Sequence, residues 1–114
     1  ILGRYRHDRG AASATRRLLR ELPPAEWPSF AEMAARLGLS EPTLRRHLAG
    51  DGESFSEIKE EIRRKLALDW LARAAKPVGQ VAADLGYTEP SAFHRAFHKW
   101  AGMSPGEFRR SRTK

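Results

Sequence analysis

Residues Pro77–Arg110 read PVGQVAADLGYTEPSAFHRAFHKWAGMSPGEFRR, and this stretch predicts two short helices separated by a tight turn. Apolar residues at helical spacing predict the first helix over Val78–Leu85. Gly86 follows where helices commonly end in a left-handed residue, a conformation that glycine adopts without steric cost. Thr88 is expected to cap the second helix. Pro90 then falls in the first turn of that helix, where a missing N–H loses no hydrogen bond.

The second helix has two faces of opposite character. Phe93, Phe97 and Trp100 recur at helical spacing and predict the side that is buried. A tight turn between two helices, with a basic second helix, is typical of proteins that place this helix in the major groove of DNA. The polar residues of the opposite, outward face are Ser91, His94, Arg95 and His98.

The segment Gly86–Arg109 resembles the signature of the AraC/XylS family of bacterial transcription regulators. The resemblance is specific because many positions agree at fixed spacing, and it extends back to about Pro24, roughly four-fifths of the chain. It implies a DNA-binding domain in which two helix-turn-helix units are joined by one long helix. The positions that carry it are Gly86, Phe93, Arg95, Phe97, Lys99, Gly102, Ser104–Pro105 and Phe108–Arg109.

The first half of the chain contains a second copy of the pattern. Residues 33–43, MAARLGLSEPT, align with residues 81–91, VAADLGYTEPS, at an offset of 81 − 33 = 48. A repeated helix-turn-helix is stronger evidence than either copy alone. Two similar hairpins in a purely structural bundle are the alternative, and this leaves the outward arginines unexplained. Beyond residue 43 the register is expected to slip by one, which pairs Leu44 with Phe93, Arg46 with Arg95 and Leu48 with Phe97.

Capping signals predict the helices of the first copy. Ser29 and Glu32 have the spacing of a capping box and open a helix expected over Phe30–Leu37. Ser40 is expected to cap a helix over Glu41–Ala49. The outward face of that helix combines small residues with arginines, which suits close approach to base edges. Its members are Pro42, Arg45, Arg46 and Ala49.

A long connector helix is expected over residues 55–75. Its apolar stripe changes side along the way, so that one half closes each small core, and Trp70 is expected at the crossover. Its charged residues, among them Arg63, predict a solvated surface laced with ion pairs. The two stripes are Phe55, Ile58, Ile62 and Leu66, and then Ala67, Leu68, Leu71 and Ala75.

The two ends of the chain are expected to differ. A helix is predicted from about Ala12 to Glu21, ended by Pro23–Pro24, and its arginines predict a solvated face or phosphate contacts. Ser104 and Glu107 form another capping box, which opens a short terminal helix. The last basic residues could contact phosphates or be disordered. These residues are Arg109, Arg110, Arg112 and Lys114.

The predicted fold is therefore all-α, with about seven helices in two helix-turn-helix subdomains. We expect a linker remnant over residues 1–10, a first subdomain over 11–54, the connector helix over 55–75 and a second subdomain with a basic tail over 76–114. The chain begins at Ile1 rather than Met. Since larger members of the resembled family carry an effector-sensing or dimerising domain on the N-terminal side, we expect the chain to be a piece of such a regulator.

Composition narrows the classes of function. The formal net charge of +7 over 114 residues favours a polyanionic partner, with nucleic acid first and an anionic membrane surface second. The absence of cysteine excludes disulfides, zinc–thiolate sites and cysteine nucleophiles. No apolar run is long enough to span a bilayer. His94 and His98 are four residues apart, but no third ligand is evident, so no metal site is expected. We also expect neither a cofactor nor an enzymatic activity.

We therefore expect sequence-specific binding of double-stranded promoter DNA in the bacterial cytoplasm, with RNA polymerase as a further partner. Two recognition helices would enter successive major grooves about 34 Å apart. One alternative is a helical protein-interaction module that docks RNA polymerase without reading DNA, and another is a non-specific basic nucleic-acid binder. The target sequence, the effector, and activation versus repression stay open. The candidate DNA-binding residues are Pro42, Thr43, Arg45, Arg46, Pro90, Ser91, His94, Arg95 and Lys99.

Overall fold

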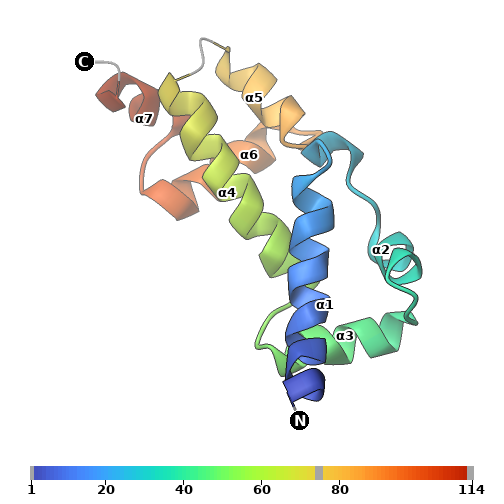
Figure 1. The fold of residues 1–114 in the computed structure, drawn as a ribbon. Coiled ribbons are helices and arrows are strands. Elements are labelled where there is room, and N and C mark those ends of the chain that lie inside the picture. The colour runs from blue at the N-terminus through green and yellow to red at the C-terminus, as the bar shows by residue number, and fades with distance from the viewer. Residues whose placement is uncertain (1, 74–75, 113–114) are drawn as a thin grey trace. The chain divides into compact units, whose positions relative to one another are not determined.

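The structure is a computed structural model that describes residues 2–73 and 76–112, with side chains described from residue 10 onward. No strand occurs among these residues, so the predicted all-α class is confirmed (Figure 1). The helices are α1 (Leu2–Arg20), the 3₁₀ helix η1 (Pro24–Glu26), α2 (Phe30–Arg36), α3 (Glu41–Gly50), α4 (Phe55–Arg73), α5 (Val78–Asp84), α6 (Pro90–Ala101) and α7 (Pro105–Arg112).

The chain divides into two compact units. The first unit comprises the described residues up to Leu22 together with Glu26–Glu60. The second unit comprises Pro23–Ala25 and the described residues from Glu61 onward. Each unit therefore contains one pair of short helices, α2–α3 or α5–α6, and each takes part of the long helix α4.

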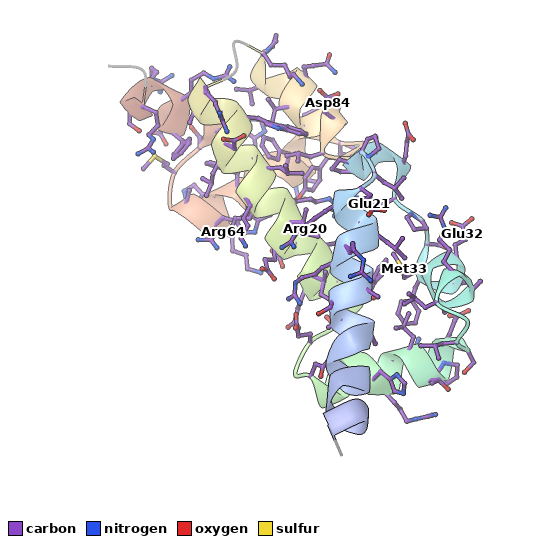
Figure 2. All side chains as sticks on the ribbon, viewed as in Figure 1. Arg20, Glu21, Glu32, Met33, Arg64 and Asp84 are labelled. Carbon is purple, nitrogen blue, oxygen red and sulfur yellow. The ribbon has the colours of Figure 1, made fainter. Side chains whose placement is uncertain are left out.

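The core of the first unit is mostly aliphatic. Within it α1 and α2 both pack against α3. Met33 is fully buried on the inner side of α2, while Glu32 lies on the outer side (Figure 2). The indole Nε1 of Trp27 donates to the Leu19 carbonyl oxygen at 2.8 Å, which ties the segment after η1 back to α1. The other buried apolar residues of this unit are Ala11, Ala12, Leu19, Ala34, Leu44, Leu48, Phe55 and Ile58.

The core of the second unit is built around aromatic rings. The ring of Phe97 lies 5.9 Å from that of Phe93, 6.2 Å from that of Trp100 and 5.5 Å from that of Phe108, measured between centroids. Burying one such ring stabilises the fold by about 1.5–3 kcal/mol, and tilted or edge-on ring pairs add to that. The buried members of this core are Ala67, Leu71, Val81, Ala82, Leu85, Phe93 and Phe97.

The start of α1 differs from the prediction. The helix begins at Leu2 rather than near Ala12, so the backbone of the predicted linker remnant is helical from Leu2 on. The stretch contains no proline, and Gly10 inside a helix costs only about 1 kcal/mol relative to alanine. The predicted end is confirmed to within one residue, because α1 stops at Arg20 ahead of the two prolines.

Two residues of α4 lie elsewhere than predicted. Trp70 does not mark a crossover between cores but packs against the second core, with the Lys76 ammonium 5.0 Å from its ring centroid. Leu66, expected with the first stripe, packs against the same core. Both residues lie beyond Glu60, the last residue of the first unit. The part of α4 that belongs to the first unit therefore ends earlier than the predicted first stripe, which runs to Leu66. Ala75, the last residue of the second stripe, lies outside the described residues.

Candidate nucleic-acid interface

The first head, which we define as α2, α3 and the turn between them, is held by its own side-chain caps. The Ser29 N–H donates to the Glu32 carboxylate at 2.9 Å, and the Glu32 N–H donates to Ser29 Oγ at 3.1 Å, which confirms the predicted capping box. Gly38 follows α2 with φ +72°. Ser40 then caps α3 by accepting the Thr43 N–H at 3.2 Å. The predicted boundaries of both helices hold to within one residue.

The outward face of α3 is exposed and carries its two arginines in different settings. The Arg46 guanidinium donates to Thr43 Oγ1 at 3.2 Å, and that oxygen also accepts from Ser40 Oγ at 2.9 Å. The cap of the helix therefore orients Arg46. The Arg45 guanidinium instead lies 5.2 Å from the centroid of the Phe30 ring, over α2. Thr43 is half-buried, whereas Pro42, Arg45, Arg46 and Ala49 are exposed.

The second head, α5 with α6 and the turn between them, is clamped by a residue from α4. Arg63 Nε donates to the Leu85 carbonyl oxygen at 3.0 Å, and the guanidinium lies 5.1 Å from the Tyr87 ring centroid. Arg63 was predicted on a solvated surface, and this was wrong. The carbonyl at the end of α5 needs a donor, and the long side chain of Arg63 reaches it from α4. No local sequence signal links residues 22 positions apart.

Gly86 lies inside this clamp. Its φ is +93°, which confirms the predicted left-handed turn. A Cβ at this position would lie 3.0 Å from the Pro24 carbonyl oxygen and 3.4 Å from the Arg63 guanidinium. Gly38, its counterpart in the first head, has open space around the same position. The turn of the second head is therefore closely packed, whereas that of the first is not.

The predicted cap of α6 was wrong. Thr88 is exposed and does not cap the helix; Glu89 occupies the N-cap position, with no hydrogen bond from its side chain. Glu89 is extended at φ −121° and ψ 121°, a conformation that proline favours in the residue before it, whereas Glu41, which also precedes a proline, is helical. The helix then starts at Pro90, whose fixed φ suits the first helical position.

The place of the register slip follows from these caps. Equivalent backbone hydrogen bonds follow the ends of α2 and α5. The Leu39 N–H donates to the Ala34 carbonyl oxygen, and the Tyr87 N–H donates to the Ala82 carbonyl oxygen, so the two bonds are 48 residues apart in the sequence. The N-caps Ser40 and Glu89 are already 49 apart. The extra residue thus lies in the turn, rather than after Thr43 and Ser91 as predicted. The predicted pairs at 49, Leu44 with Phe93 and Leu48 with Phe97, are all fully buried.

The outward faces of the two recognition helices correspond at this offset of 49. On α6 the four predicted outward residues, Ser91, His94, Arg95 and His98, are all exposed, and so is Lys99. His94 Nδ1 lies 2.9 Å from the Pro90 carbonyl oxygen. Both faces combine exposed polar or basic groups with a fully buried opposite side. The corresponding pairs are Pro42 and Ser91, Arg45 and His94, Arg46 and Arg95, and Ala49 and His98.

The start of α5 has no side-chain cap. Pro77 is the N-cap residue and makes no cap hydrogen bond. The Lys76 ammonium donates to the Asp84 carboxylate at 2.8 Å, and Gln80 Nε2 donates to the same group at 2.9 Å. These hydrogen bonds, that from Lys76 first, hold the pKa of Asp84 below its usual value. The ion pair joins Lys76, which precedes the N-cap residue of α5, to Asp84, the last residue of the helix.

The basic C-terminal segment is partly structural. Ser104 and Glu107 form the predicted capping box, with 2.9 and 3.1 Å between donor and acceptor. The hydrogen bond from the Ser104 N–H is the main cause that lowers the pKa of Glu107. Arg109 Nε donates to the Leu71 carbonyl oxygen at 3.2 Å, so this arginine fastens α7 to α4. Arg110 and Arg112 are exposed, and Lys114 lies outside the described residues.

The described residues hold no group of three or more histidine, cysteine, aspartate or glutamate side chains placed to bind a metal ion. His94 and His98 share an exposed face without a third such group. Among the same residues, no helix combines the length and the apolar character needed to cross a membrane.

Two helix-turn-helix units with exposed basic second helices define a helix-turn-helix protein. Residues 33–111 match the family model of a helix-turn-helix domain of the AraC type. The chain is 35% identical over 100 residues to the ornithine utilization regulator of Pseudomonas aeruginosa. That alignment covers 88% of this chain and 29% of the relative, so the chain spans less than a third of that regulator.

Solved structures share the fold. The DNA-binding transcriptional dual regulator from Escherichia coli K-12 superposes with a TM-score of 0.78 at 26% identity, over 85% of this chain and 86% of that one. The C-terminal domain of AraT, a response regulator from Geobacillus stearothermophilus, gives a TM-score of 0.81 at 25% identity, over 91% and 87%. The chain belongs to the AraC-type helix-turn-helix family of transcription regulators.

Proposed function

We propose that this chain is the DNA-binding part of a bacterial transcription regulator and that it recognises a specific duplex sequence with α3 and α6, each in a major groove. One observation carries the proposal. The same helix-turn-helix occurs twice, and Arg46 and Arg95 occupy equivalent exposed positions opposite fully buried residues. A structural hairpin has no need of an outward arginine at the same place in both copies.

In the first head we assign base reading to Arg46. Its hydrogen bond to Thr43 holds the guanidinium on the outward face, and arginine can donate two bonds to guanine O6 and N7. Pro42 is exposed in the first turn of α3 and suits apolar contact with a thymine methyl group. Arg45 lies over the Phe30 ring on α2, the helix that crosses the backbone in this motif, so we assign it to a phosphate.

In the second head Arg95 is the counterpart of Arg46 and takes the same role. Pro90 and Ser91 are exposed at the start of α6, where residues of a recognition helix contact base edges. His94 lies beside them on the same face. Lys99 is exposed in the last turn of the helix and suits a phosphate contact.

The two heads present different side chains, so one copy of the chain would recognise a non-palindromic site. Its two blocks would be centred about ten base pairs apart, one turn of the duplex. The net charge of +7 adds a sequence-independent attraction that weakens as salt rises. Glu41 and Glu89 are exposed at the starts of α3 and α6, where a carboxylate can accept from cytosine N4.

The intact regulator is expected to contain more than this chain. The ornithine utilization regulator is more than three times as long as the matched region, and AraT contains a domain of this fold at its C-terminal end. We propose that the remainder of the protein senses an effector or pairs two copies, and that RNA polymerase is a partner at the promoter. Such a role belongs in the bacterial cytoplasm, where the chromosome lies.

Selection of random duplex DNA by this chain tests the proposal. We expect one enriched motif with two unlike blocks. Arg46→Glu should abolish enrichment of one block and Arg95→Glu that of the other. Arg64→Glu is the matched control, because this exposed arginine belongs to α4 rather than to either head and undergoes the same change of charge.

The alternatives give different results in the same experiment. A non-specific binder enriches nothing, and its affinity falls steeply with salt for every sequence. A protein-docking module retains its binding to RNA polymerase in both charge-reversal variants and shows no sequence preference. Either result would replace the proposed function.

A further inference from the structure

The hydrogen bond of His94 defines which of its ring nitrogens carries the proton. Nδ1 lies 2.9 Å from the Pro90 carbonyl oxygen, and a carbonyl oxygen can only accept a hydrogen bond. Nδ1 is therefore the protonated nitrogen of the neutral ring. Nε2 then carries a lone pair and no hydrogen, so neutral His94 presents an acceptor at its outer end.

The position of the ring supports a role in recognition. His94 is exposed on the outward face of α6, next to Arg95. Its ring packs edge-on against the Phe93 ring, with 6.1 Å between centroids, and Phe93 is fully buried. The hydrogen bond and the ring contact together restrict the rotamer. Nε2 is thus offered outward in a defined direction rather than by a freely rotating side chain.

The first head differs at the equivalent position. Arg45, which lies at the offset of 49 from His94, is exposed and offers N–H donors but no acceptor. Guanine presents only acceptors in the major groove, whereas cytosine and adenine present the exocyclic amines N4 and N6. At this place the second head therefore offers an acceptor, which suits an exocyclic amine, whereas Arg45 of the first head offers only donors, which suit the phosphate oxygen assigned to it above.

We propose that His94 is a specificity-determining residue that accepts a hydrogen bond through Nε2 from the exocyclic amine of a cytosine or an adenine in the major groove. The inference rests on the proposed function and adds the base class to it. It predicts that the second block contains an amine-bearing base opposite His94, and that guanine is disfavoured there on the same strand.

The test removes the amine and the histidine in turn. The selected site is synthesised with each cytosine of the second block replaced by 2-pyrimidinone and each adenine by purine, which lack only the amine. Affinities are measured at about pH 8, where an ordinary imidazole is neutral. At one position the loss should be about two- to tenfold for the unmodified protein and absent for His94→Ala. His94→Gln, which keeps an acceptor, should retain the loss.

A matched control and an independent measurement complete the test. His98→Ala lies one turn further along the same exposed face and should leave the effect of amine removal unchanged. In the free protein, ¹⁵N chemical shifts of the His94 ring should show the form with hydrogen on Nδ1. A neutral ring with its hydrogen on Nε2 would overturn the inference.

The outcomes separate this inference from the proposed function. If a two-block motif is enriched but amine removal costs the unmodified protein and His94→Ala the same factor at every position, DNA reading stands and the role of His94 is wrong. If no motif is enriched at all, both are wrong. If His94→Arg changes the preferred base at one position of the second block to guanine, both are supported.

Discussion

The two heads reach the same helix-turn-helix shape by different means. In the first head Ser29 and Ser40 cap the two helices, and the turn at Gly38 has open space around it. The second head has no side-chain cap at the start of α5 or α6, and its turn is held by Arg63. Local hydrogen bonds thus stabilise the first head, whereas a contact with α4, which is distant in the sequence, stabilises the second.

The cores follow the same division. Leu44 and Leu48 occupy positions in α3 that Phe93 and Phe97 occupy in α6, and all four side chains are fully buried. The larger rings form a connected set that extends to Tyr87 and Phe108. The second head therefore depends more on its core, and the first more on its caps. The first three predictions below each change one residue and its counterpart.

The largest effect is expected from Phe97→Ala. The ring is fully buried among three aromatic neighbours, so its loss should lower the free energy of unfolding by about 3–5 kcal/mol. The counterpart Leu48→Ala should cost less, within about 2–5 kcal/mol, because fewer atoms are removed. Urea denaturation followed by circular dichroism measures both. A smaller loss for Phe97→Ala than for Leu48→Ala would contradict the aromatic account of the second core.

Glycine substitution separates the two turns. Both glycines have positive φ, which costs an alanine roughly 1–2 kcal/mol, so Gly38→Ala should lose about that much. Gly86→Ala should lose about 1 kcal/mol more, because its Cβ meets the Pro24 carbonyl oxygen at 3.0 Å. Thermal unfolding of the two variants gives the comparison. Equal losses would mean that the second turn is no more tightly packed than the first.

The caps give a smaller and opposite contrast. Ser40→Ala removes the acceptor for the Thr43 N–H and should cost about 1 kcal/mol. Thr88→Ala should change stability by less than about 0.5 kcal/mol, because Thr88 is exposed and caps nothing. Urea denaturation curves of the two variants and of the unmodified protein measure both changes in stability. A loss near 1 kcal/mol for Thr88→Ala would restore the cap that the sequence suggested and would falsify the observed start of α6.

The smallest effect concerns acid and is confined to the second unit. The hydrogen bond from the Ser104 N–H lowers the pKa of Glu107. The folded-state pKa therefore lies below the unfolded one, so this contribution is present above the unfolded pKa, about 4.3, and is lost as pH falls through the folded value. Stability of the unmodified protein and of Glu107→Gln should converge as the pH falls through and below the unfolded pKa. Parallel curves over that range would argue against the shift.

Local signals in the sequence were sufficient for most of the fold. The capping boxes at Ser29 and Ser104 and the glycines that end α2 and α5 act within a few residues, so the sequence displays them directly. The outward faces of α3 and α6 followed from helical periodicity, and the structure places them at the surface. Their contacts with bases stay a prediction.

Other features depend on contacts that no short pattern encodes. Arg63 and Leu85 are 22 positions apart in the sequence, so no local pattern indicates their hydrogen bond. The sequence therefore predicted a solvated position for Arg63. Ser40-Glu-Pro and Thr88-Glu-Pro look alike, yet only the first caps a helix. The buried positions of Phe93 and Phe97 determine where α6 must begin, and these require both helices of the pair.

The extra residue in the second turn bears on how such a repeat can diversify. One residue turns a helix by about 100°, so a grafted segment copied at the offset of 48 would exchange surface Arg45 with core Phe93. Transplanting a reading face between the heads requires the offset of 49 instead. With the offset of 49, the side chains at the four outward positions can be exchanged between the heads without changing either core. Turn length and surface composition are thus separate controls over what each copy recognises.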